Sequence, residues 1–324
     1  DRHLDPTFLR NCEQAMRTGE PGFSFNFGSK QNETLRNACC EVVSEDDSDV
    51  CNLGSVNLSR IDSVERLKTV VALASKFLVC GTLTADLPSA KVRAVREKNR
   101  RLGLGLMGIH EWLLKRNFRY EVNGELKQWL WVYKEYSEFG ANALCDALGI
   151  NRPKAYRAIA PTGTIGMIAG TTTGIEPLFA VAYKRRFLRG SENWHYQYVI
   201  DGTAKTLIDE CGVSPDSIDT AYGMANDFER RIQFQADIQD YVDMAISSTI
   251  NIPSWGSDLN NPDKVKDFAT TLSKYAHRLR GFTVYPDGSR GGQPITECSY
   301  QEAVEHGDHI YEENEQCRGG VCGI

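Results

Sequence analysis

The chain has 324 residues, 41% of them hydrophobic, with a net charge of -6 and a pI near 5.6. A chain of this length can bury a substantial core in one large domain or two smaller ones. Its acidic balance argues against a nucleic-acid-binding surface, because neutralising phosphates requires clustered lysines and arginines. We therefore expect a globular protein with no nucleic-acid partner.

The N-terminal stretch "DRHLDPTFLR" has neither the basic start nor the apolar run of a signal peptide. We find no run of eighteen or more apolar residues, so we expect no membrane partner and a cytoplasmic location. In a reducing compartment the ten cysteines should be mostly thiols. Any pair that forms a disulfide would then be redox-active rather than structural.

Two amphipathic helices are predicted in the first half of the chain. Between residues 65 and 79 the apolar residues fall on one helical face, and residues 126–136 repeat the pattern, with Gly149 as a plausible stop. The lone cysteines Cys80 and Cys145 fall within helical patterns and should behave as small buried hydrophobes. The acidic run at residues 44–49, "SEDDSD", predicts a solvated turn.

The segment "RRLGLGLMG" places glycines at positions 103, 105 and 108 in a G-x-G-x-x-G spacing. That spacing is common by chance, and we find no strand, tight turn and helix around it. We interpret it as close helix packing against small residues rather than as a dinucleotide site.

After residue 155 the pattern changes. "YRAIAPTGTIGMIAGTTTGIEPLF" is rich in β-branched residues broken by Gly and Pro, which predicts short strands, tight turns and a helix start. Helices are expected at 236–247 and 262–279, each followed by an extended piece, "STINIP" and "GFTVYP". This alternation favours an α/β protein with parallel strands, and an α/β barrel or half barrel is our first choice.

Residues 301–324 are acidic and lack apolar periodicity, so they predict a flexible tail. Cys317 and Cys322 flank two glycines there, and such a pair can form a disulfide and be reduced again. A structural zinc site generally needs two close pairs of ligands, whereas this is the only short pair. We therefore expect no metal site.

Five blocks in order carry a family resemblance: "NACCE", "VCNLGSVNL", "RRLGLGLMG", "APTGTIGMIAGTTTGIEPLF" and the terminal "CRGGVC". Together they resemble the catalytic (large) subunit of ribonucleotide reductase. The resemblance implies that residues 1–300 form the C-terminal part of a ten-stranded α/β barrel made of two half barrels, with a catalytic finger loop inside. Residues 301–324 would be a redox-active tail.

The family motif N-x-C-x-E matches Asn37, Cys39 and Glu41. The resemblance makes Cys39 the carrier of a thiyl radical, Glu41 the acid/base at the ribose 3'-hydroxyl and Asn37 a hydrogen-bonding partner of the ribose hydroxyls. A carboxylate that takes the 3'-hydroxyl proton eases loss of the 2'-hydroxyl. In an extended loop Cys39 and Glu41 would lie on the same side, while Cys40 would point away and pack as a small side chain.

Cys51 matches the family's second reducing cysteine, whose partner normally lies far upstream on the first half barrel. Cys12 has the wrong context to supply that partner, so we expect the N-terminal half of a complete reductase to be missing. Cys317 and Cys322 resemble the C-terminal shuttle that reduces the active-site disulfide and is reduced by thioredoxin or glutaredoxin.

The segment "PTGTIG" resembles the loop that grips the substrate phosphates, where backbone N–H groups of small residues converge on an anion. Its members here are Thr162, Gly163, Thr164, Ile165 and Gly166. Glu176 in "GIEP" also belongs to the family pattern, and we expect it to be structural.

The radical source is predicted from the C-terminal end of the barrel. Reductases with a separate metal-containing subunit carry two adjacent tyrosines there, whereas "GFTVYPDGSR" has Tyr285 alone, which we interpret as a barrel-core aromatic. "AISSTINIP" and "TVYPDGSR" look like the class II enzymes, which use adenosylcobalamin. The substrate would be a ribonucleoside diphosphate or triphosphate.

Three alternatives stay open. A class I reductase with a separate radical-generating subunit is favoured by the short cysteine tail. A fragment that only complements a partner chain would have no need of the intact Asn37, Cys39, Glu41 and Cys51 set. A plain α/β binding domain would leave the tail cysteines unexplained.

Overall fold

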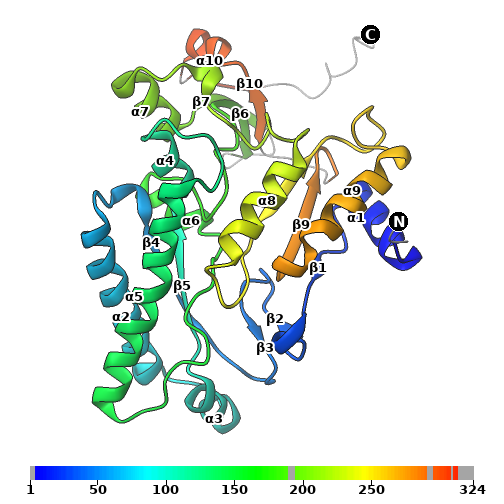
Figure 1. The fold of residues 1–324 in the computed structure, drawn as a ribbon. Helices are drawn as coiled ribbons and strands as arrows, with labels where there is room; N and C mark the ends of the chain where they lie inside the picture. The colour runs from blue at the N-terminus through cyan, green and yellow to red at the C-terminus, as the bar shows by residue number, and fades with distance from the viewer. Residues whose placement is uncertain (1–3, 189–193, 290–294, 308, 313–324) are drawn as a thin grey trace.

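The computed structural model describes residues 4–188, 194–289, 295–307 and 309–312 (Figure 1). The α-helices are α1 Pro6–Thr18, α2 Val64–Thr84, α3 Ala90–Asn99, α4 Ile109–Leu114, α5 Gly124–Leu148, α6 Gly163–Ala169, α7 Gly202–Cys211, α8 Phe228–Gln239, α9 Val265–Tyr275 and α10 Tyr300–His306. The strands are β1 Phe23–Ser24, β2 Leu35–Arg36, β3 Val43–Ser44, β4 Asn52–Asn57, β5 Leu102–Met107, β6 Ala182–Leu188, β7 Trp194–Ile200, β8 Thr249–Ile252, β9 Gly281–Pro286, β10 Ile295–Cys298 and β11 Ile310–Glu312.

A row of parallel segments forms the frame. β4 pairs in parallel with β5, and parallel bridges join Leu104 to Arg157 and Ile159 to Ile246. β8 continues from that last segment and pairs in parallel with β9, whose far side carries the antiparallel β1. The expected α/β architecture with parallel strands is confirmed. The described strands form an open row, as in a half barrel, rather than a closed barrel.

Helices cover this row on the outside (Figure 1). α2 and α5 lie against β4 and β5, while α1, α8 and α9 lie against β8 and β9. Two apolar clusters fill the spaces beneath them. The first includes Leu67, Val71, Leu78, Leu126, Trp129, Leu130 and Tyr133, as the two predicted amphipathic faces require. The second includes Phe268, Leu272, Phe282 and Val284.

The predicted ends of α5 and α9 are close to those observed. Gly149 stops α5 with a φ of 63°, in the left-handed region that favours glycine. A helix expected at 262–279 appears as α9 with a short 3-10 turn on each side, and both extended pieces are strands. The helix expected at 236–247 is wrong in position, because α8 begins after Asp227, whose carboxylate caps the helix by accepting from the Arg230 N–H.

The interpretation of the glycine-rich segment as helix packing is wrong. Residues 102–107 form β5, all six of them buried, followed by a turn at Gly108 and then by α4. A Cβ at Gly105 would lie 2.6 Å from the Ala158 carbonyl oxygen, so glycine lets the neighbouring segment approach. A strand buried on both faces has a continuous apolar sequence. It therefore shows neither the two-residue alternation of a half-buried strand nor the 3.6-residue period of an amphipathic helix.

A second, antiparallel sheet in the order β10-β6-β7-β11 lies at the C-terminal end of β9, together with α7 and α10 (Figure 1). Part of the expected tail belongs to it: residues 300–306 form α10, and β11 pairs with β7. Tyr198 of β7 attaches α10 to this sheet, because its ring stacks on His306 and its hydroxyl donates a hydrogen bond to Glu302. Cys317 and Cys322 lie outside the described residues.

Two further expectations are met only in part. The acidic run is a turn as predicted, but it is solvated only in part: Glu45 and Asp47 are exposed, whereas Asp49 is buried against Arg101. Cys145 is buried as predicted, whereas Cys80 is exposed. Within the described chain, α2 is long and apolar enough by composition to cross a membrane, with a third (33%) of its apolar window buried in the fold.

Candidate active site

A tight turn carries the N-x-C-x-E motif between β2 and β3. The Cys40 N–H donates to the Asn37 carbonyl at 3.0 Å, and the Val42 N–H donates to the Asn37 Oδ1 at the same distance. Cys40 takes a φ of 67°, which is uncommon for a residue other than glycine. The expectation of an extended loop is therefore wrong, although Cys40 does pack as a half-buried side chain, facing Gly281.

Glu41 is buried beneath this turn, with 2% of its surface exposed. Its backbone carbonyl accepts from the Ala245 N–H at 2.9 Å, which ties the turn to the segment before β8. Its Oε2 is buried with no hydrogen-bond partner in the described part of the chain. A buried carboxylate oxygen without a partner is rare in folded proteins, so this one is available to a ligand hydroxyl.

Cys39 lies at the tip of the turn and is exposed. The pKa of its thiol is raised by partial burial of the sulfur first, and then by the nearby negative charge of Glu41. A raised pKa keeps the S–H bond intact at neutral pH. The S–H form is the one from which a hydrogen atom can be removed.

Cys51 lies immediately before β4, the strand at the edge of the row. A Cβ at Gly103 would come within 2.9 Å of its Sγ, so the glycine in β5 makes room for this thiol. The pKa of Cys51 is also raised, by burial first and then by Asp49, with Glu41 adding to the effect and Arg101 opposing it. The charge of Glu41 thus acts on both cysteines of the predicted set.

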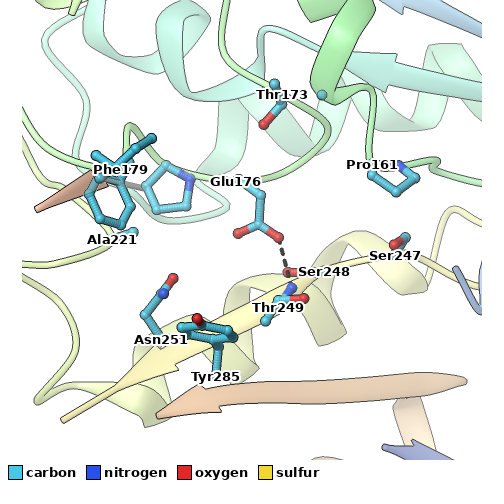
Figure 2. A pocket seen from close by; sticks show the side chains of 13 residues that line it. Pro161, Thr173, Glu176, Phe179, Ala221, Ser247, Ser248, Thr249, Asn251 and Tyr285 are labelled. Carbon is cyan, nitrogen blue, oxygen red and sulfur yellow. Dashed lines mark hydrogen bonds between the residues drawn. The ribbon is translucent and has the colours of Figure 1, made fainter. Parts of the chain in front are cut away.

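A cavity of about 490 Å³ lies between the segment after Ile159 and the segment before β8 (Figure 2). It is lined by Pro161, Gly163, Thr173, Glu176, Pro177, Phe179, Ala221, Ser247, Ser248, Thr249, Asn251, Tyr285 and Ile295. Ser247 is only two residues from Ala245, the partner of Glu41. The lining set does not itself include Cys39, Glu41 or Cys51. Its volume is typical of a small-molecule site.

The loop that resembles a phosphate site lies at one wall of this cavity, because Gly163 is both a lining residue and the first residue of α6. Thr162 precedes the helix at a φ of 52°, and its hydroxyl accepts from the Gly174 N–H at 2.7 Å. Thr164 and Ile165 are exposed, while Gly166 is buried against Thr173. The hydroxyl of Thr162 therefore holds the loop together.

Glu176 and Tyr285 face the cavity from opposite walls (Figure 2). One Glu176 oxygen accepts from the Thr249 N–H at 2.9 Å and the other pairs with buried Arg231, so the side chain braces β8 while also lining the cavity. Tyr285 is half-buried on the cavity side of β9, with Phe282 and Val284 on the core side. It therefore lies on the face of β9 that the helices do not cover, where it lines the cavity.

The polar lining of β8 was not anticipated. Thr249 and Asn251 line the cavity, whereas Ile250 and Ile252 are buried in the core. This alternation of polar and apolar residues in "STINIP" is a period-two pattern that could have assigned one strand face to the site. In the described ranges no group of three His, Cys, Asp or Glu side chains could hold a metal ion.

Comparison with known proteins assigns the family. The profile described as "Ribonucleotide reductase, barrel domain" matches residues 11–127 and 151–285. This chain belongs to the ribonucleotide reductase barrel-domain family. The five sequence blocks therefore predicted the family correctly, and the matched ranges contain the whole turn, Cys51 and the α6 loop.

Among its relatives is a putative adenosylcobalamin-dependent ribonucleoside-triphosphate reductase of Mycobacterium phage D29, which is 27% identical over 96% of this chain and 50% of its own length. A vitamin B12-dependent ribonucleoside-diphosphate reductase of Mycobacterium tuberculosis (strain CDC 1551 / Oshkosh) is 26% identical with the same coverage. The chain spans about half the length of the curated relatives it matches.

A crystal structure of a B12-dependent (class II) ribonucleotide reductase matches with a TM-score of 0.75 at 17% identity, over 93% of this chain and 48% of that one. The class Id α subunit of Actinobacillus ureae matches with a TM-score of 0.62 at 16% identity, over 88% and 62%. At these identities both matches support the fold.

Proposed function

We propose that this chain is the catalytic, C-terminal part of a ribonucleotide reductase that converts ribonucleoside diphosphates or triphosphates to 2'-deoxyribonucleotides. The observation that carries the proposal is the buried, unpartnered Oε2 of Glu41, on the same turn as Cys39 and close enough to Cys51 to shift its pKa. Asn37, Cys39, Glu41 and Cys51 are the proposed reacting set.

In this mechanism the Cys39 thiyl radical removes the 3'-hydrogen atom, while Glu41 takes the proton of the 3'-hydroxyl. The 2'-hydroxyl then leaves as water. Cys51 and a second cysteine supply two electrons and two protons and end as a disulfide, and Cys39 returns a hydrogen atom to C3'. Asn37 keeps its Nδ2 group for the ribose hydroxyls, because its Oδ1 is already bonded to the Val42 N–H.

The substrate phosphates would bind at the start of α6, at Thr162, Gly163, Thr164, Ile165 and Gly166. The first N–H groups of a helix lack partners within the helix, and Gly163, the first residue of α6, lines the cavity. We assign the donors to these backbone groups rather than to the Thr162 hydroxyl, which is occupied.

We assign the radical source to adenosylcobalamin, on the strength of relatives named for it and of Tyr285 being followed by Pro286 rather than by a second tyrosine. When bound, that cofactor supplies a radical by homolysis of its cobalt–carbon bond. The cavity fits its nucleoside-sized adenosyl group, for which Phe179 and Tyr285 offer flat apolar surfaces. The described residues do not enclose a corrin ring.

The missing partner is proposed to be the first half barrel, which would bring the second cysteine. β4 pairs on one side with β5, and its outer edge is unpaired within the described strands, with Leu53 44% exposed. An exposed strand edge is a template for another strand. A half barrel docked there would also shield Cys39, as a radical requires. Reduction of the disulfide through Cys317, Cys322 and thioredoxin or glutaredoxin completes the proposal.

The test uses the chain combined with a first half barrel, as a co-expressed or fused polypeptide. We expect nucleotide reduction that requires adenosylcobalamin and no metal-containing second subunit. Cys39→Ser should abolish deoxyribonucleotide formation, whereas the adjacent Cys40→Ser should retain it. If the Cys39→Ser variant formed deoxyribonucleotides at the rate of the unaltered protein, the catalytic assignment of Cys39 would be refuted. Turnover only with a metal-containing subunit would instead establish the class I alternative.

A further inference from the structure

The segment that carries the active-site turn is joined to the fold by two arms, Glu33–Arg36 and Val43–Asp49, which together with the turn we call the finger. Its own ladder is short, since β2 and β3 pair through only two residues each. Two-stranded ladders of this length are marginal in water. Something outside the ladder must therefore fix the position of the turn.

Buried charges provide that connection. Arg101, whose side chain is 0% exposed, donates its Nε to the Asp49 Oδ2 at 2.7 Å and its Nη2 to the Glu33 Oε1 at 3.3 Å. The second Glu33 oxygen accepts from the Arg280 Nη2 at 2.8 Å. One arginine thus holds both arms of the finger, and a second holds the entry arm.

The two arginines stand immediately before strands of the frame. Arg101 directly precedes β5 and Arg280 directly precedes β9, so each arginine lies at the N-terminal end of its strand. Asp49 is held further by the Ser44 hydroxyl at 2.7 Å and by the Asn99 amide at 2.8 Å. A buried ion pair adds little net stability, but it fixes one arrangement among alternatives, because any other leaves a charge without its partner.

We propose that Arg101 is a positioning residue that clamps both arms of the finger to the frame and thereby holds the Cys51 thiol against Gly103. The inference rests on the proposed function for its meaning, since it concerns the same site. Cys51 follows Asp49 by two residues, and Gly103 follows Arg101 by two, so a shift of either ion-pair partner moves the thiol contact directly.

A thiol-labelling experiment separates clamping from a simple charge effect. The positive charge of Arg101 lowers the pKa of Cys51, so a purely electrostatic role predicts that Arg101→Gln slows alkylation of this thiol. Clamping predicts the opposite, because the released arms expose it. We expect Arg101→Gln to speed iodoacetamide labelling of Cys51 by about tenfold, read by mass spectrometry of the intact folded chain.

Cys145, buried in the other helical layer, is the internal reference and should keep its slow rate. A slower or unchanged Cys51 rate in Arg101→Gln overturns the proposal. If the labelling of Cys145 also becomes faster, the Arg101→Gln variant has unfolded, and Arg101→Lys is used instead. Lysine keeps the positive charge but cannot reproduce the two hydrogen bonds of the guanidinium. Arg101→Lys must then speed the labelling of Cys51 without changing that of Cys145. Labelling needs no turnover, so its outcome is independent of the Cys39→Ser test.

Discussion

The finger carries the proposed reacting residues and the α6 loop, residues 161–174, lines the cavity, and the two regions are held in different ways. The finger depends on buried ion pairs that join it to Arg101 and Arg280. The α6 loop depends on short-range contacts: the Thr162 hydroxyl bonds the Gly174 N–H, and Gly166 packs on Thr173. Charges act over longer distances than contacts do, so the finger can influence thiol chemistry that the loop cannot.

This difference makes the finger the more sensitive of the two to charge changes. Removing one partner of a buried ion pair leaves the other uncompensated, whereas removing a hydroxyl leaves a single N–H without an acceptor. Both regions should tolerate substitutions at their exposed positions. The following substitutions test that ranking.

The largest effect on stability is expected in the finger. Asp49→Ala should lower the free energy of unfolding by about 3 to 5 kcal/mol, because buried Arg101 loses its best partner. Denaturant unfolding measures this. The matched control is Asp47→Ala, whose exposed pair with Lys91 is screened by water, so it should unfold like the unaltered chain. Equal effects from both substitutions would remove the distinction between buried and surface charges in this segment.

A smaller effect is expected in the α6 loop. Thr162→Val keeps the side-chain shape but removes the acceptor of the Gly174 N–H, which should cost about 1 to 3 kcal/mol. Amide hydrogen exchange at Gly174 should become faster. Thr164→Val, at an exposed position of the same loop, should change neither quantity. Unaltered exchange in Thr162→Val would show that the hydroxyl does not hold the loop.

The smallest effect concerns the thiols themselves. Glu41→Gln removes a negative charge that raises the pKa of both Cys39 and Cys51, so both pKa values should fall and more thiolate should form at a given pH. Alkylation of each thiol near pH 8 should then accelerate by about threefold. Glu45→Gln, in the same segment, is the control. A change at only one cysteine would contradict the shared influence of Glu41.

Much of the fold could be predicted from local patterns. The faces of α2 and α5, the stop at Gly149, the extended pieces at β8 and β9 and the parallel arrangement all follow from the spacing of apolar residues and from glycine. β5 could not, because a strand buried on both faces shows no alternation. The position of α8 was missed because its capping residue, Asp227, lies before the apolar stretch used to place the helix.

The candidate site divides in the same way. Its motif residues and their family were readable from the sequence, and the profile match confirms that family. The polar face of β8, the bracing role of Glu176 and the cavity position of Tyr285 emerged only with the fold. Each depends on which strands become neighbours in the fold, and the local sequence around these residues does not specify that pairing.

By itself, then, the amino-acid sequence determined the family, the helical faces and the order of the reactive residues, since these depend on residue type and on spacing of a few positions. Only the tertiary structure decided how the finger is held. Glu33, Asp49, Arg101 and Arg280 come from four separate places in the chain, and only Asp49 lay in a segment whose environment was predicted, as part of a solvated turn. They become a clamp because folding removes them from water, where each charge must find an opposite one.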